Sequence, residues 1–304
     1  MAVTLGIYLV MRRAALGGLA PGQQMYFHLS PMAFALSVVV TAAQYLGRLF
    51  FPADLNYFHL FHPTQSVTPG LIISVATLAA VALAFFRVRI AMVSYGIFWM
   101  AATIAPPLNI AGVGPNVLAE RYLYLPSAGF CWIAAWAWDW WVERQPLWAK
   151  FAAAGILLAC TAEAITRTGD WRDDFTLFQK TAQQSPASAF VQDELASLYV
   201  ERDAFDTALQ HERLAVQYEP GTAMYRKKLG YLLLDKDPRG AIVQFRKALE
   251  LEPSAIQGHC DLALALEGAG DISQAAAEYR KVLQLRPENR EAREGYQRVM
   301  AKLH

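Results

Sequence analysis

Charge is scarce in this sequence. Only 17% of its 304 residues are Asp, Glu, Lys or Arg, whereas a soluble globular domain usually carries about 25%. The positive and negative residues nearly cancel, leaving a formal net charge of +1. A nucleic-acid partner requires a basic face on the protein, so this charge balance argues against nucleic-acid binding.

Cysteine is scarce as well, and Cys131, Cys160 and Cys260 lack the spacing of metal ligands. Because their number is odd and two of them lie in apolar runs, they are interpreted as small buried side chains. His59 and His62 are three residues apart and could share a helix face, but no third metal ligand stands near them. We therefore expect neither a metal site nor a bound cofactor.

Apolar residues are abundant: they make up 55% of the chain, and they gather in its first half. Five runs are long enough, or nearly so, for tilted transmembrane helices. These predicted spans are residues 28–46, 70–86, 90–106, 123–141 and 148–166. A sixth run, residues 1–11, is too short to cross a bilayer, which needs about twenty residues, and we expect it to be the end of a helix whose first part is missing. Residues 1–167 are thus predicted to form a transmembrane region.

Basic residues divide unequally between the loops that connect alternating spans. One set of loops holds six of them, whereas the other holds only Arg48 and Arg121. The positive-inside rule assigns the first set to the cytoplasm. We therefore expect loops 47–69 and 107–122, and the chain after residue 167, on the non-cytoplasmic side of a bacterial inner membrane, or of the ER membrane in a eukaryote. The six residues of the first set are Arg12, Arg13, Arg87, Arg89, Arg144 and Lys150.

The second half of the chain contains three repeats, predicted over residues 189–287. The pairs Leu195-Ala196, Leu229-Gly230 and Leu262-Ala263 follow one another at intervals of 34 and 33 residues, and each unit ends in a proline. This spacing of small and large residues is typical of tetratricopeptide (TPR) repeats. The predicted fold class is therefore all-α, a polytopic transmembrane helical bundle followed by a TPR α-solenoid. Residues 168–188 would form a junction with a lone helix, and residues 288–304 a polar capping helix.

The first helices of the three repeats predict a concave groove that binds an extended peptide of an acceptor or partner protein. The alternative is that this surface is a spacer or a site of self-association. No cluster in the repeats resembles a catalytic site. The predicted groove residues are Asp193, Ser197, Lys227, Tyr231, Leu264 and Glu267.

A charged pair, Glu120-Arg121, stands at the mouth of the apolar run 123–141. Charges at such a place tend to be paired or to face a wet cavity. The planar guanidinium of Arg121 could bind a lipid phosphate. Alternatively, Arg121 extends to the lipid headgroups with Glu120 as its partner.

Three segments together resemble a known family. They are Ala119-Glu-Arg-Tyr-Leu-Tyr-Leu-Pro-Ser127, the stretch 51–57, and the segment 167–178 ahead of the repeats. In content and order they are similar to the transmembrane-and-TPR O-mannosyltransferases and their bacterial relatives. The resemblance implies a GT-C type membrane glycosyltransferase, a polyprenyl-phosphate sugar as donor, and a protein hydroxyl as acceptor. It places Glu120 and Arg121 in the family's signature loop, and we assign both to donor binding as a hypothesis.

The chain departs from the family pattern near its N-terminus. Family members usually have further spans there, and their acidic catalytic residues lie in the first outward loop. Asp54 is the only aspartate in the outward loops of the predicted membrane region, and it is a weak candidate, so the catalytic residues are not identified. We expect the C-terminal part of a glycosyltransferase, completed by a missing N-terminal part or by a second chain. The alternative is a non-catalytic membrane-anchored TPR scaffold that binds proteins.

Overall fold

A computed structural model describes residues 29–52, 56–110 and 116–303, and all regular elements among them are helices. The predicted all-α fold class is confirmed. The chain divides into two compact units, Met1–Ala164 and Ile165–His304. The short run 1–11, Arg12, Arg13 and Asp54 lie outside the described residues.

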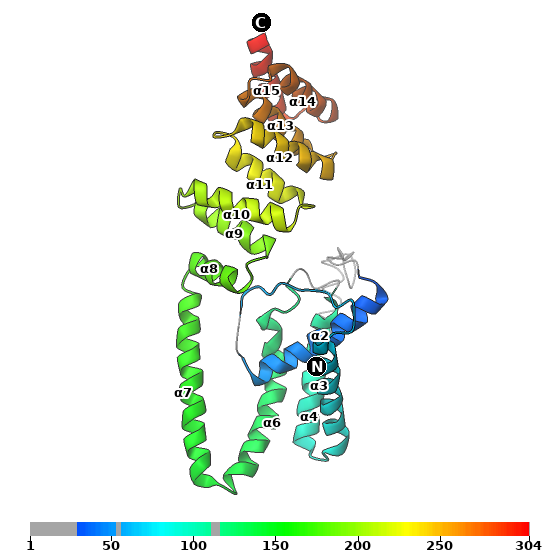
Figure 1. The fold of residues 1–304 in the computed structure, drawn as a ribbon, viewed down its shortest axis with the longest axis vertical. Helices are drawn as coiled ribbons and strands as arrows, with labels where there is room; N and C mark the ends of the chain where they lie inside the picture. The colour runs from blue at the N-terminus through cyan, green and yellow to red at the C-terminus, as the bar shows by residue number, and fades with distance from the viewer. Residues whose placement is uncertain (1–28, 53–55, 111–115, 304) are drawn as a thin grey trace. The chain divides into compact units, whose positions relative to one another are not determined.

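Unit 1 contains apolar helices joined by short turns and two longer loops (Figure 1). Helices α3 and α4 form a hairpin, and α2 packs obliquely against α3. Two 3-10 turns, η1 (Pro106–Leu108) and η2 (Glu120–Leu123), lie between α4 and α6. The helices are α2 (Pro31–Phe50), α3 (Pro69–Arg87), α4 (Ala91–Ile104), α6 (Tyr124–Val142) and the greater part of α7 (Pro146–Asp170).

The first two helices begin at polar caps followed by proline. The Ser30 side chain accepts a hydrogen bond from the backbone N–H of Ala33, and Thr68 does the same for Leu71. Each cap satisfies one of the backbone donors that a helix leaves open at its N-terminus. Proline at the next position has the backbone angle of a helix and no N–H to satisfy. These local signals fix where α2 and α3 leave the preceding loops.

Of the helices that the structure describes, α2, α3 and α7 are long and apolar enough to cross a membrane. The predicted span 90–106 is shorter than expected, since α4 has 14 residues and extends only about 21 Å at about 1.5 Å per residue. Pro106 and Pro107 lie directly after it and prevent the α-helix from continuing. The predicted span 123–141 coincides within one residue with α6, which carries Asp139 and five tryptophans.

Helices α4 and α6 are held together at two glycines. A Cβ atom built on Gly96 would lie 2.7 Å from the carbonyl oxygen of Gly129, and one built on Gly129 would lie 2.6 Å from that of Gly96. Any side chain at either position would therefore collide with backbone. Small residues of this kind allow apolar helices to approach closely inside a membrane, where van der Waals packing replaces the hydrophobic effect.

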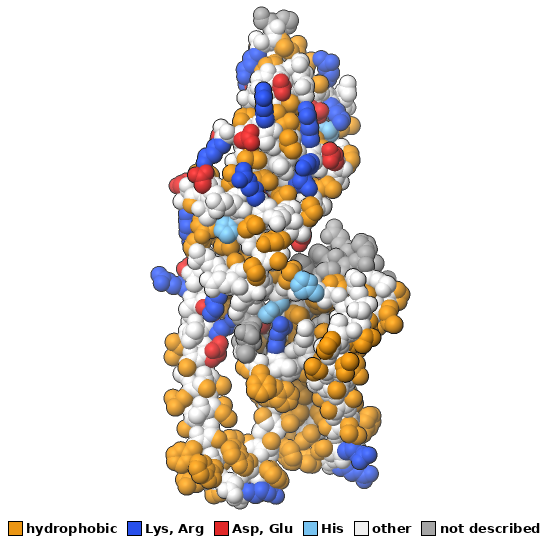
Figure 2. Space-filling model, in the orientation of Figure 1, with side chains coloured by type: hydrophobic (Ala, Val, Ile, Leu, Met, Phe, Trp, Pro, Cys, Tyr) orange, Lys and Arg blue, Asp and Glu red, His pale blue; other side chains and the backbone are white. Residues whose placement is uncertain are grey.

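Large apolar side chains cover the outside of unit 1. In Figure 2 they form the surface of its helices, while Lys and Arg side chains mark the end where the α3–α4 and α6–α7 turns lie. Helix α7 buries only Ala149, and side chains such as Leu147, Trp148 and Leu158 are exposed. Exposed apolar surface of this extent is typical of a lipid-facing region.

Unit 2 is a stack of helix pairs (Figure 1). Helix α8 occupies the segment expected to form a lone helix, three pairs follow it, and α15 occupies the segment expected to be the cap. Each helix packs against its neighbours in sequence, as in an α-solenoid. The helices are α8 (Asp174–Gln184), α9 (Ala189–Val200), α10 (Phe205–Tyr218), α11 (Ala223–Leu233), α12 (Pro238–Leu251), α13 (Ile256–Gly268), α14 (Ile272–Leu285) and α15 (Arg290–Leu303).

Small residues facing aromatic rings produce the close packing of the repeats. A Cβ on Gly230 would lie 2.7 Å from the ring of Phe245, and one on Gly295 would lie 2.4 Å from the ring of Tyr279. Both rings are buried. The recurring small and large positions in the sequence are therefore the contact points between successive helices.

The boundary between the units falls inside a helix. It lies after Ala164, whereas the sequence suggested residue 167, and α7 continues to Asp170. Thr168, Gly169 and Asp170, assigned from the sequence to the junction, are thus the last residues of α7. Asp173 caps the next helix by accepting a hydrogen bond from the Thr176 N–H.

Candidate functional site

A polar stripe runs along α2 of unit 1. Ser37, Thr41 and Tyr45 are buried, and they recur every four residues in an otherwise apolar helix. This spacing places them on one face of the helix. Arg48 follows in the last turn of α2. The stripe gives one side of α2 a row of hydrogen-bonding groups.

The stripe holds two loops that are far apart in the sequence. The Ser37 Oγ accepts a hydrogen bond from the Thr64 N–H (2.9 Å), and the Tyr45 hydroxyl donates one to the Val117 carbonyl (2.5 Å). The guanidinium of Arg48 donates to the carbonyl of Leu118 (3.2 Å). Loops 56–68 and 116–119 are thus attached to the same helix, and we call these loops with the α2 stripe the loop platform.

A direct contact also joins the two loops. The Asn116 side-chain amide donates a hydrogen bond to the carbonyl oxygen of Tyr57 (2.9 Å). Val117, Leu118 and Ala119 are buried, so the segment leading to the Glu120-Arg121 pair is fixed on both sides. Buried backbone groups normally find such partners, because an unmade hydrogen bond in an apolar setting is unfavourable.

The Glu120-Arg121 pair opens the turn η2, which leads directly into α6. Glu120 is half-buried and interacts electrostatically with Arg48 of the loop platform. Arg121 is exposed, and its Nη2 lies 3.4 Å from the hydroxyl of Tyr122. Two arginines, one carboxylate and two tyrosine hydroxyls, including that of Tyr45, are thereby gathered near the start of α6.

A cavity of about 280 Å³ lies beside Arg121. Its walls come from the end of α4, the turn η1, the turn η2 and the start of α6, and they are mostly apolar. The indole N–H of Trp99 on α4 donates a hydrogen bond to the Leu125 carbonyl on α6 (2.8 Å), which fixes the two walls against each other. A guanidinium at the edge of an apolar cavity can bind a phosphate through charge-assisted hydrogen bonds. The lining residues are Thr103, Pro106, Pro107, Arg121, Tyr122 and Leu125.

Both histidines of loop 56–68 belong to the loop platform. His59 is half-buried and His62 is exposed. Among residues 29–52, 56–110 and 116–303, no group of three or more His, Cys, Asp or Glu side chains is arranged to hold a metal ion.

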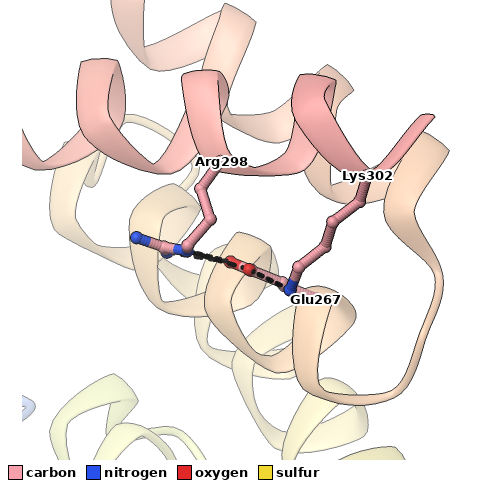
Figure 3. A network of polar contacts seen from close by, with 3 residues as sticks. All are labelled: Glu267, Arg298 and Lys302. Atoms are coloured by element: carbon pink, nitrogen blue, oxygen red, sulfur yellow. Dashed lines mark hydrogen bonds and ion pairs between the residues drawn. The ribbon is translucent and has the colours of Figure 1, made fainter. Parts of the chain in front are cut away.

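In unit 2, the carboxylates of two predicted groove residues form ion pairs with neighbouring helices. The carboxylate of Asp193 is buried and forms an ion pair with Lys228 of α11 (2.5 Å). That of Glu267 accepts hydrogen bonds from Arg298 and Lys302 of α15, each with a shortest distance of 2.8 Å (Figure 3). Both carboxylates therefore link one repeat to the next.

The other four predicted groove residues have free surface. Tyr231 and Leu264 are 44% and 41% exposed, and Ser197 and Lys227 are half-buried. Tyr231 packs edge-on against Phe245 with its ring centroid 5.3 Å away. These four side chains come from α9, α11 and α13, the first helices of successive repeats, as the repeat register predicted.

Sequence reasoning missed the residues that position these groups. Tyr45 is one of them, since its hydroxyl holds the loop that precedes Arg121. The four-residue recurrence of Ser37, Thr41 and Tyr45 within an apolar helix was the signal for this role. Lys228 and Arg298 were also missed, and each lies about one repeat length, 35 or 31 residues, from its partner.

Comparison with known proteins confirms the resemblance at low identity. Protein O-mannosyl-transferase TMTC3 of Mus musculus is 23% identical over 213 residues, covering 64% of this chain and 23% of that protein. Tmtc3 of Drosophila melanogaster is 26% identical over 125 residues (40% and 14%), and TMTC4 of Mus musculus is 31% identical over 103 residues (33% and 14%). The chain spans less than a quarter of the length of these relatives. No protein-family model matches the chain.

Solved structures of TPR proteins are also similar to parts of the chain. A MamA crystal structure is 17% identical with a TM-score of 0.40, covering 45% of this chain and 75% of that protein. YrrB, described as a TPR protein with an unusual peptide-binding site, is 15% identical with a TM-score of 0.41 (46% and 73%). The first TPR of Spaghetti (RPAP3), bound to an HSP90 peptide, is 20% identical with a TM-score of 0.36 (38% and 93%).

Proposed function

We propose that this chain forms the C-terminal part of a GT-C type membrane glycosyltransferase that transfers a sugar from a polyprenyl phosphate to a protein hydroxyl. The observation that carries the proposal is the match to O-mannosyltransferases over 64% of the chain. Such an enzyme needs a membrane part for its lipid-linked donor and a soluble part for its protein acceptor. The chain has apolar helices long enough to cross a membrane, and it has a unit of helical repeats.

The donor would bind where Arg121 meets the cavity between α4 and α6. Its phosphate would interact with the guanidinium, while Tyr122 and Thr103 offer hydroxyl groups beside it. Glu120 would orient this region through its interaction with Arg48 rather than touch the phosphate, because two anions repel each other. The loop platform keeps the segment in place before the donor arrives, which reduces the entropy lost on binding.

The acceptor or a partner protein would bind to the repeats. Tyr231 and Leu264 provide exposed apolar surface, and Ser197 and Lys227 provide polar groups beside it. An extended peptide can use such a surface through a few side-chain contacts. The charges of Asp193 and Glu267 take no direct part, since cations of this chain already neutralise them.

The repeats would lie on the non-cytoplasmic side of the membrane. The basic turns α3–α4 and α6–α7 lie at one end of unit 1 (Figures 1 and 2), and the positive-inside rule favours the cytoplasm for that end. The loop platform belongs to the connections at the opposite ends of these helices. A bacterial inner membrane or an ER membrane fits this arrangement.

Donor binding is tested with Arg121→Ala in the full chain reconstituted in nanodiscs. The dissociation constant for polyprenyl-phosphate mannose should rise about tenfold or more, because a hydrogen bond to a charged group contributes about 1.5–3 kcal/mol. The matched control is Arg89→Ala, an exposed arginine in the turn between α3 and α4. An affinity that Arg121→Ala leaves unchanged would remove Arg121 from the donor site.

A second candidate is a non-catalytic membrane-anchored scaffold. It is favoured because loops 47–69 and 107–122 together hold only two acidic residues, Asp54 and Glu120. A transfer assay separates the two candidates. The chain is incubated with the donor and an acceptor peptide, alone and with a polypeptide that supplies the N-terminal spans of a relative. Transfer in either mixture supports the enzyme, and its absence from both supports the scaffold.

A further inference from the structure

Two buried carboxylic acids lie side by side in the first repeat, and one of them forms an ion pair with a lysine of the second repeat. Glu212 on α10 is 1% exposed, and its side chain lies within hydrogen-bonding reach of that of Asp193 on α9. Lys228 on α11 is 2.5 Å from Asp193 and also 3.4 Å from the hydroxyl of Ser197. The Oε1 atom of Glu212 is buried and has no hydrogen-bond partner in the described part of the chain.

The charges at this place do not balance if both acids are ionised. One ammonium group would then face two buried carboxylates, and an uncompensated charge in a protein interior is strongly unfavourable. Two carboxyl groups that share a site avoid this by keeping one proton between them. Glu212 is the group that retains it, because Asp193 already has the ion pair with Lys228.

Among the described residues, Lys228 is the one cation that acts on Glu212. Glu194 of α9 adds a negative charge nearby, and α11 adds the hydroxyl of Tyr225. Asp174 of α8 acts on Glu194 with the same sign. The groups facing the pair from α8, α9 and α11 are therefore acidic or neutral, with the exception of Lys228.

We propose that Glu212 is a proton-linked switch of the first two repeats: opening of the packing among α9, α10 and α11 releases one proton from this buried carboxyl group. In the closed state, a protonated Glu212 donates a hydrogen bond to Asp193. In the open state, both acids are hydrated and ionised, and Lys228 is free. Because Ser197 and Lys227 are neighbours of these residues, the same opening reshapes one end of the predicted groove.

The direction of the pH dependence follows from the proton balance. Burial and, secondly, the Asp193 carboxylate raise the pKa of Glu212 to about 8, from an ordinary value of 4.5. Between these two values the closed state holds a proton that the open state has lost, so rising pH favours opening. The closed state is most stable below about pH 4.5. Above this pH the equilibrium constant for opening rises about tenfold for each pH unit, and it reaches a plateau above about pH 8.

The test is hydrogen–deuterium exchange of the full chain in nanodiscs between pH 5 and pH 9. Protection factors of α9–α11 peptides, corrected for intrinsic exchange, should fall by up to about tenfold per pH unit and then level off near pH 8. In Glu212→Gln the slope should vanish, because an amide of the same shape cannot release a proton. Glu250→Gln, an exposed acid on α12, should retain the wild-type slope. A slope that persists in Glu212→Gln overturns the proposal.

A second measurement does not depend on local opening. Infrared spectra at pH 7 should show a protonated-carboxyl band in the wild type that Glu212→Gln lacks. Asp193→Asn should lose the band too, because Lys228 can then pair with an ionised Glu212. An identical band in wild type and Glu212→Gln would show that Glu212 is ionised and refute the switch. Neither measurement involves donor or acceptor, so its outcome is separate from that of the proposed transfer reaction.

Discussion

At the scale of single residues, Glu267 determines how the last helix is fastened. Arg298 donates to both carboxylate oxygens, and Lys302 donates to one of them (Figure 3). The Glu267 side chain is only 8% exposed, although Arg298 and Lys302 are about half exposed. Because two cations hold this shielded carboxylate through several charge-assisted hydrogen bonds, we expect it to contribute more than an isolated surface ion pair. The hydrogen bond from Arg298 is the main reason that the pKa of Glu267 is lowered below its ordinary value.

Glu267→Gln should destabilise the docking of α15 by about 1–3 kcal/mol, since it removes a charged hydrogen-bond acceptor. Hydrogen exchange of α15 amides at pH 7 measures this loss. Acid should have the same effect on the wild type, because a lowered pKa contributes stability above about pH 4.5 that disappears as the carboxylate is protonated. Glu294→Gln, which breaks an exposed pair on the same helix, should leave protection nearly unchanged, because solvent screens such a pair. Equal effects of the two substitutions would contradict the shielding of Glu267.

The repeat register predicts on which helices the proposed groove residues lie. It does not predict which of their side chains are free to bind a ligand. The register placed Asp193 and Glu267 on the first helices of their units correctly, but it says nothing of the cations that reach them. Those cations lie on the next repeat, 31 to 35 residues later. Opposite charges separated by about one repeat length are a usable signal for such contacts in a solenoid, where each unit touches its neighbour.

At the scale of elements, the crossing of α4 and α6 should be the least tolerant point of unit 1. Gly96→Ala places a methyl group against the Gly129 carbonyl and the Ile133 side chain, and overpacking of this kind destabilises by about 1–3 kcal/mol. Thermal unfolding of the full chain in detergent, followed by tryptophan fluorescence, should show a lower midpoint. Gly155→Ala on α7, where the new methyl group meets open space, should leave it unchanged. A normal midpoint for Gly96→Ala would mean that the helices separate without loss.

The helices of unit 1 were easier to predict than the hydrogen bonds that join them to the loops. Apolar runs located the five described helices of unit 1, yet the predicted span 90–106 overstated the length of α4 because it ran on to Pro106. The loop platform could not be read from a window along the chain, since its hydrogen bonds join residues about 70 positions apart. Only the polar stripe on α2 was visible in the sequence, and its partners were not.

At the scale of the whole molecule, the side of the membrane on which the repeats lie decides whether an acceptor bound to them could meet the lipid-linked donor. If the repeats lie on the non-cytoplasmic side, as the positive-inside rule predicts, protease added to that face of sealed membranes should remove them. Immunoblotting for an epitope at the C-terminus measures the loss. The control is an epitope fused to a known cytoplasmic protein in the same vesicles, which should survive. Digestion of the repeats from the cytoplasmic face alone would reverse the topology.

The hydroxyl groups inside α2 have a consequence for the interpretation of sequence variants. In the printed chain, Ser37 and Thr41 look like ordinary small residues in the middle of an apolar helix. In the folded protein, the Ser37 hydroxyl anchors loop 56–68, and that loop is joined through Asn116 to the segment that leads to Arg121. Loss of this one hydroxyl group would therefore affect the position of Arg121, which Ser37 does not contact. We expect a defect caused by a substitution of Ser37 to arise from displaced loops rather than from altered contact with the bilayer.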